Sequence, residues 1–420
     1  MFEKFKSSQA FDVLRPVNFR YFLLYRFFMT LATLMQSVVV GWHIYKLTGN
    51  VFALGLIGLT EVIPQVSVAL FAGHFVDICN RQKVIFYTTF LLLAGSAWLV
   101  IYSIPAFGLF TRFGVTPIFI TIFLTGLSRG ILMPAHNALL GQLVERKYFP
   151  KAATWSSVTW HIAAVCGPAV GGLVYGFSQN EVVTYSTVFT AYLTAFLLIS
   201  RIKVEKLQTG EITEGIFARI HEGVRFVFNS PYLWGAFTLD MFAVLFGGAV
   251  ALLPAFAKDV LFVGPQSLGF LRAAPAMGAI LMSLFLMFRP PVKNTGTLLF
   301  IAVSGFGLCM IGFALSTSFA LSLILLFLSG IFDNVSVVIR GTILQIYTPE
   351  HMKGRVSSVN SIFIGSSNEL GAFESGLAAR LMGLVPSVVF GGAMTLIVVG
   401  VMSKVNPALK KMSFAKQHVQ

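Results

Sequence analysis

The chain has 420 residues, of which 56% are hydrophobic and 11% charged, and its mean hydropathy is +0.82. Soluble globular proteins carry about 25% charged residues, so this composition excludes a soluble domain as the main part of the chain. The formal net charge of +14 comes from Lys and Arg between apolar segments. That placement indicates membrane topology and argues against binding to nucleic acid.

Apolar segments of roughly 20 residues recur along the whole chain, and each is long enough to cross ~30 Å of hydrocarbon. They predict twelve transmembrane helices centred near residues 32, 64, 95, 128, 164, 190, 244, 278, 306, 333, 368 and 395. The segments are too long and too continuously apolar for barrel strands, so we expect an all-α membrane protein.

Basic residues are distributed along the chain in a way that predicts its orientation. The first basic segment, MFEKFKSSQAFDVLRP at 1–16, has no cleavage-site pattern and is not expected to be a signal peptide. Every second loop after it is rich in Lys and Arg, whereas the loops between hold only Lys46, Arg112 and Lys258. By the positive-inside rule we expect both termini in the cytoplasm, on a multi-pass protein of the cytoplasmic (inner) membrane.

The loop between the second and third predicted spans reads GHFVDICNRQK, residues 73–83. Gly73 lets helices approach closely, while Asp77 and Arg81, with Lys83 nearby, can form a charge cluster at the cytoplasmic face. This loop resembles the signature of the major facilitator superfamily, although Ile and Asn stand where that family commonly has Arg and Gly. An ordinary basic loop is the alternative interpretation.

The fifth predicted span contains CGPAVGG at 166–172. It resembles the glycine-proline signature of the antiporter branch of the same superfamily. Gly167, Gly171 and Gly172 permit close helix contact, and Pro168 kinks or stiffens the span. Close packing alone also explains these residues, and the two interpretations are compatible.

The two halves of the chain repeat one another. A shift of 204 residues places GLSRGILMPAHNALL (126–140) on GIFDNVSVVIRGTIL (330–344). We therefore expect two six-helix bundles, at 1–200 and at 231–420 with its basic tail, joined by a polar linker at 201–230. Apolar residues at helical spacing in the linker, in EGIFARIHEGVRFVF, predict a surface helix at the cytoplasmic interface.

The resemblance to the major facilitator superfamily extends over essentially the whole chain. Runs such as YRFFMTLATLMQSVVVGWHIYKLT, LDMFAVLFGGAVALLP and GRVSSVNSIFIGSSNELGAFESG are similar to its drug and siderophore exporters. The resemblance implies twelve helices in two pseudo-symmetric bundles, with a central cavity lined by spans one, four, seven and ten. It also implies export of a bulky organic solute, siderophore or drug-like, by proton antiport. Uptake or lipid flipping, and a non-transporting receptor or secretion accessory, are the alternatives.

Ionisable residues inside spans are candidates for function, because each costs on the order of 2.5–3.5 kcal/mol on insertion scales. Three pairs of repeat mates are of this kind. The shift of 204 residues places Arg129 on Asp333 and His136 on Arg340, and a shift of 214 residues earlier in the chain places Arg26 on Asp240. Our hypothesis is that these groups form a polar cavity wall that changes partners and titrates during transport, with Asp240 and Asp333 as favoured carboxylates. Structural ion pairs that never titrate are the alternative.

Two further charges lie in spans two and eight. Glu61 is expected to pair with Arg26 or to reach the cavity, and Arg272 is a candidate to attract an anionic group of the substrate. Structural roles are the alternative for both residues.

The eleventh predicted span, IFIGSSNELGAFESG at 362–376, carries two glutamates. On a helical wheel Glu369 shares a face with Gly365, Ala372 and Gly376, where another helix can come close. Glu374 points about 140° away, so the two are not expected to form a carboxylate dyad. We predict a proton-titrating or gating role for Glu369 and a contact across a helix interface for Glu374, with structural roles as the alternative.

No nucleophile triad, metal-ligand cluster or phosphate-binding loop is evident in the sequence. Cys79, Cys166 and Cys309 show neither metal nor disulfide spacing. We therefore expect no enzyme activity, no cofactor and no bound metal. The expected partners are a small organic substrate, protons and the lipid bilayer, and the expected state is a monomer.

Overall fold

Helices are the only regular elements in the part of the chain that the structure, a computed structural model, describes. The described residues are 12–145, 148–204, 216–289, 291, 293–349 and 352–414. The prediction of an all-α protein is therefore confirmed.

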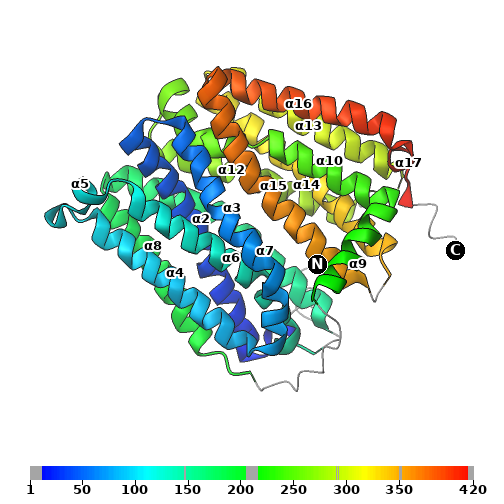
Figure 1. The fold of residues 1–420 in the computed structure, drawn as a ribbon, viewed down its shortest axis with the longest axis horizontal. Helices are drawn as coiled ribbons and strands as arrows, with labels where there is room; N and C mark the ends of the chain where they lie inside the picture. The colour runs from blue at the N-terminus through cyan, green and yellow to red at the C-terminus, as the bar shows by residue number, and fades with distance from the viewer. Residues whose placement is uncertain are drawn as a thin grey trace, which may run out of the picture. The chain divides into compact units, whose positions relative to one another are not determined.

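Twelve long helices lie where the apolar segments predict them (Figure 1): α2 (Val17–Thr48), α3 (Val51–Ile78), α4 (Arg81–Ser103), α6 (Thr116–Leu143), α7 (Phe149–Ser178), α8 (Glu181–Ser200), α10 (Pro231–Phe246), α12 (Pro265–Phe288), α13 (Thr295–Leu315), α14 (Phe319–Tyr347), α15 (Lys353–Met382) and α16 (Leu384–Val405). The seventh span continues past α10 through η4 (Ala249–Leu252), α11 (Leu253–Ala255) and a π-turn, η5 (Phe256–Val260). The shorter elements are η1 (Asp12–Leu14), η2 (Pro105–Phe107), α5 (Leu109–Phe113), α9 (Ile216–Asn229) and α17 (Pro407–Lys410).

Eleven spans in the described chain are long and apolar enough to cross a membrane, counting the seventh as one continuous span to Val260. The remaining long helix is α15, which has 30 residues but is the least apolar of the twelve. It carries Glu369 and Glu374 together with several Ser and Asn residues. A helix of this composition needs protein rather than lipid around its polar side, and α15 packs against α9, α10, α14 and α16.

Side-chain caps set the first residues of several helices. The Asn80 side chain accepts a hydrogen bond from the Lys83 N–H and begins α4, and Asn180 accepts from the Val182 N–H and begins α8. Ser230 caps α10 in the same way through the Leu233 N–H. These bonds satisfy backbone donors that have no partner within the helix.

The chain divides into two compact units, and the first comprises Met1–His43 and Ile63–Glu211. Within it α4 packs against both α6 and α8, and α4 and α8 run side by side in Figure 1. The glycines of the CGPAVGG segment pack α7 closely onto α2: a Cβ at Gly167 would lie 3.0 Å from the Leu31 carbonyl, and one at Gly171 2.9 Å from the Met35 side chain. The segment therefore does form a close helix contact.

The second unit comprises Ile44–Val62 and Ile212–Gln420. Within it α14 packs against α12 and α13, α16 against α13, and α10 against α15 and α16. The start of α3 belongs to this unit because two of its glycines contact α15. A Cβ at Gly55 would lie 2.9 Å from the Gly376 Cα, and one at Gly58 would lie 2.7 Å from the Ala372 Cβ. This is the close helix contact expected on the Glu369 face of α15.

The linker helix predicted from the EGIFARIHEGVRFVF pattern is present as α9. It packs against α15, where the backbone of Gly223 approaches that of Arg355 and the Glu222 carboxylate pairs with the Arg355 guanidinium. The buried Val227 joins α9 to the core of the second unit.

Replacing Gly330 by Ala tests another close helix contact, between α14 and α12. A Cβ at Gly330 would overlap the Pro275 carbonyl of α12, so we expect the free energy of unfolding to fall by about 1–3 kcal/mol as the helices move apart. Gly400→Ala on α16 is the matched control, because a Cβ there meets no atom within 4 Å. Denaturant unfolding in detergent measures both, and equal effects of the two substitutions would contradict the packing.

Candidate functional site

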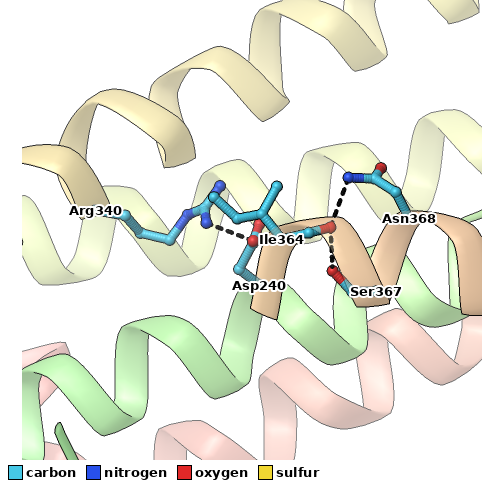
Figure 2. Close-up of polar contacts among 5 residues, drawn as sticks. All are labelled: Asp240, Arg340, Ile364, Ser367 and Asn368. Atoms are coloured by element: carbon cyan, nitrogen blue, oxygen red, sulfur yellow. Dashed lines mark hydrogen bonds and ion pairs between the residues drawn. The ribbon is translucent and has the colours of Figure 1, made fainter. Parts of the chain in front are cut away.

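An ion pair joins Asp240 on α10 to Arg340 on α14 in the interior of the second unit (Figure 2). The Arg340 Nη1 donates to the Asp240 Oδ2. Asp240 is only 5% exposed and Arg340 only 6%. Within the described chain the Arg340 Nε is enclosed and has no hydrogen-bond partner. Buried charges of this kind are stable only when each is compensated by the other.

Asp333 adds a second carboxylate to this pair. It is half-buried on α14, seven residues before Arg340 and therefore on the same helix face, and it interacts electrostatically with both Asp240 and Arg340. Two carboxylates thus share one guanidinium, which leaves one negative charge that a proton can neutralise. We call Asp240, Asp333 and Arg340 the inner cluster.

A second group of the same composition joins three helices. Arg272 on α12 interacts electrostatically with Glu61 on α3 and with Glu369 on α15. The close backbone contact of Gly58 with the Glu369 carbonyl places these helices together, and Glu61 follows Gly58 by about one turn. Again two carboxylates share one guanidinium. We call Glu61, Arg272 and Glu369 the outer cluster.

The polar residues before Glu369 bond to their own helix. Asn368 Nδ2 donates to the Ile364 carbonyl at 2.8 Å, and Ser367 Oγ donates to the same oxygen at 3.1 Å (Figure 2). Glu369 is therefore the polar side chain of this turn that is left to interact with Arg272. Glu374, five residues later, is half-buried with its carboxylate beside Ser375 of the same helix.

The first unit holds the other charged candidates, Arg26 on α2 and Arg129 and His136 on α6, all half-buried. His136 Nε2 and the Tyr25 hydroxyl are 2.9 Å apart, and that hydroxyl is also 3.2 Å from Thr89 Oγ1. Tyr25 was not among the predicted residues, although its position beside Arg26 in a span is a usable signal. The network fixes His136 against α2.

The cytoplasmic loop motif is only partly described. Arg81 Nη1 donates to the Ala138 carbonyl at 3.1 Å and ties the start of α4 to α6, while Lys83 is exposed. Gly73 and Asp77 lie on α3, but the surroundings of Gly73 and the side chain of Asp77 are outside what the structure describes. The predicted charge cluster of this motif stays a prediction.

A polar contact at the end of the seventh span was missed in the sequence. The Tyr45 hydroxyl donates to Asp259 Oδ2, and Lys258 Nζ lies 5.3 Å from the Tyr45 ring centroid. The adjacent Lys-Asp pair directly after an apolar segment was the available signal. Among the described residues, no group of three or more His, Cys, Asp or Glu side chains is placed to hold a metal ion.

The described residues form eleven spans that can cross a membrane and the more polar helix α15. This helix set in two related halves, with charged groups inside the spans, is that of a transporter of the major facilitator fold. The chain matches, over residues 8–419, the protein family described as transmembrane secretion effectors. The chain belongs to this family, which is part of the major facilitator superfamily.

Relatives of known name share low identity over most of the chain. The multidrug efflux pump Tap of Mycolicibacterium fortuitum is 23% identical over 392 residues, covering 90% of this chain and 93% of that protein. The enterobactin exporter EntS of Shigella flexneri is 26% identical over 390 residues, covering 91% and 90%.

Solved structures confirm the fold. A POT family transporter in complex with 5-aminolevulinic acid has a TM-score of 0.74 at 10% identity and covers 94% of this chain and 97% of that one. A bacterial homolog of the human lysosomal transporter Spinster has a TM-score of 0.67 at 14% identity with the same coverage.

Breaking the Asp240–Arg340 pair is expected to destabilise the protein strongly. Arg340→Gln leaves the Asp240 and Asp333 carboxylates without their guanidinium, which costs about 3–5 kcal/mol of unfolding free energy. Asp240→Asn leaves Arg340 with Asp333 and is expected to cost less. The double variant is expected to recover part of this loss, so a double-mutant cycle measured by denaturant unfolding gives a coupling energy. Glu222→Gln is the control, because that ion-pair carboxylate is 52% exposed and worth less than about 1 kcal/mol. Equal losses in the two pairs would contradict the assignment.

Proposed function

We propose that the chain exports a bulky organic solute, siderophore or drug-like, across the cytoplasmic membrane in exchange for protons. The observation that carries the proposal is the composition of the inner and outer clusters, each with two carboxylates to one guanidinium inside the spans. The names of the relatives, an efflux pump and an enterobactin exporter, support export rather than uptake.

The charge count of the inner cluster, Asp240 and Asp333 with the one guanidinium of Arg340, supports proton coupling. A carboxylate that shares its guanidinium with a second carboxylate keeps a negative charge, and in a medium of low dielectric constant that charge favours binding of a proton or a cation. When a proton neutralises one carboxylate, the guanidinium is left to the other, and the helices that carry them are free to move. The outer cluster joins α3, α12 and α15, so a change of partner there acts on the close contact between α3 and α15.

Alternating access supplies the rest of the cycle. Two six-helix bundles, proposed at 1–200 and 231–420 with the linker at 201–230, rock about a site in the membrane interior. With both termini in the cytoplasm, the solute enters from the cytoplasm and the proton from outside. The monomer is the proposed working unit, with no cofactor.

The proposal is tested in proteoliposomes. With the lumen made acidic, molecules whose cytoplasmic side faces the bath are expected to accumulate enterobactin or a macrolide inside, because the proton leaves as the solute enters. Liposomes without protein and liposomes treated with a protonophore are the controls. Movement of the solute only in the opposite direction, or of fluorescent phospholipid instead, would favour uptake or flipping.

Neutral substitutions identify the coupling carboxylates. Glu369→Gln and Asp333→Asn cannot exchange a proton, so we expect each to lower pH-driven accumulation to the level of protein-free liposomes while equilibrium exchange of the solute persists. Glu222→Gln, on the surface helix α9, is the matched control and is expected to transport normally. A variant that keeps full pH-driven transport removes its residue from coupling.

A further inference from the structure

The charged side chains inside the membrane spans are distributed unequally between the two units. Between residues 17 and 200, apart from Glu61, the acidic residues are Asp77, Glu145 and Glu181, and all three lie at or just beyond helix ends. The membrane interior of the first unit thus holds basic side chains and no carboxylate. Away from the span ends, the second unit holds Arg272 and Arg340 but five acidic residues: Glu61, Asp240, Asp333, Glu369 and Glu374.

Arg26 is the cation that this division leaves uncompensated. In the described chain it makes no hydrogen bond or ion pair, and its Nε is enclosed without a partner. The nearest hydroxyl along the chain, that of Tyr25, is bonded to His136 and Thr89 instead. By contrast, Arg340 has Asp240, and Arg272 has Glu61 and Glu369.

An uncompensated guanidinium inside a span is unfavourable for the empty protein. Such a residue is stable once a ligand brings the missing negative charge into the same low-dielectric environment, where the attraction is strong. The guanidinium carries several N–H donors in a planar fork, which matches two oxygens held on one group better than a single atom.

We propose that Arg26 is a binding site for an anionic oxygen group of the exported solute, so that the solute is an organic acid that carries a carboxylate. The site rests on the proposed function, because it takes the solute to be the ligand of the first unit. The proposal also assigns a different ligand to each unit. The first unit binds the anionic solute, and the carboxylates of the second unit bind and release protons.

Thermal unfolding of the empty protein separates a ligand site from a structural ion pair. Removing an uncompensated cation is expected to leave the melting temperature of Arg26→Gln unchanged or higher, whereas Arg340→Gln loses the partner of Asp240 and melts lower. Arg112→Gln, in the exposed helix α5, is the control and is expected to melt as the unchanged protein. A lower melting temperature for Arg26→Gln would overturn the proposal.

Binding of matched probes tests the ligand class directly. The full chain in nanodiscs is titrated calorimetrically with 2,3-dihydroxybenzoate and with its uncharged amide. We expect the acid to bind about tenfold or more tightly than the amide, and we expect Arg26→Gln to abolish this preference. Arg26→Lys is expected to keep part of the preference, and Arg112→Gln all of it. No preference for the acid in the unchanged protein, or an unaltered preference in Arg26→Gln, would overturn the proposal.

The two proposals fail in different ways. A chain that prefers the acid but moves no solute in proteoliposomes keeps the Arg26 site and loses the export function. A chain that exports cationic drugs and shows no preference for the acid keeps the function and loses the site.

Discussion

A charge inside the bilayer needs a counter-charge, a proton or a ligand, and this requirement governs the arrangement of the second unit. Asp240 and Arg340 are almost fully buried and therefore depend on each other. Asp333 exceeds what Arg340 can balance. Stability alone requires only the matched pair. The extra carboxylate of the inner cluster is a cost to folding, and the reversible proton binding that we propose would give it a purpose.

Helix α15 shows how this constraint reaches into packing. It is too polar to face lipid on all sides, so its neighbours must cover it, and Gly55 and Gly58 let α3 come close enough to do so. The same contact that shields the helix brings Glu61 towards Arg272 and Glu369. The packing and the electrostatics are thus coupled, because the glycines set the distance at which the charged side chains interact. A larger residue at either glycine would separate α3 from α15. It would both expose the polar side of α15 and weaken the interaction of Glu61 with Arg272.

Much of the fold was predictable from the sequence because apolar length is a direct consequence of membrane thickness. The twelve spans, the linker helix and the face of α15 that meets another helix all follow from periodicity and length. The ion pairing was harder to predict. The repeat matched Asp240 with Arg26 and Arg340 with His136, whereas the structure pairs Asp240 with Arg340. A repeat shows which positions are equivalent, but neighbouring helices decide which side chains touch. Tyr45 and Asp259 were missed for the same reason, since 214 residues separate them.

The unequal charge of the two units is the feature that duplication of a common ancestor does not explain. A simple repeat would give both halves similar charges, yet Val165 and Val170 of the first half stand where the second has Glu369 and Glu374. The basic residues Arg26 and Arg129 likewise align with acidic ones. Opposite charges at equivalent positions let the halves bind different ions without competing for the same side chain. A single site shared by the proton and the solute would couple them by displacement. In the antiport that we propose, two separate sites would couple them through the helices between.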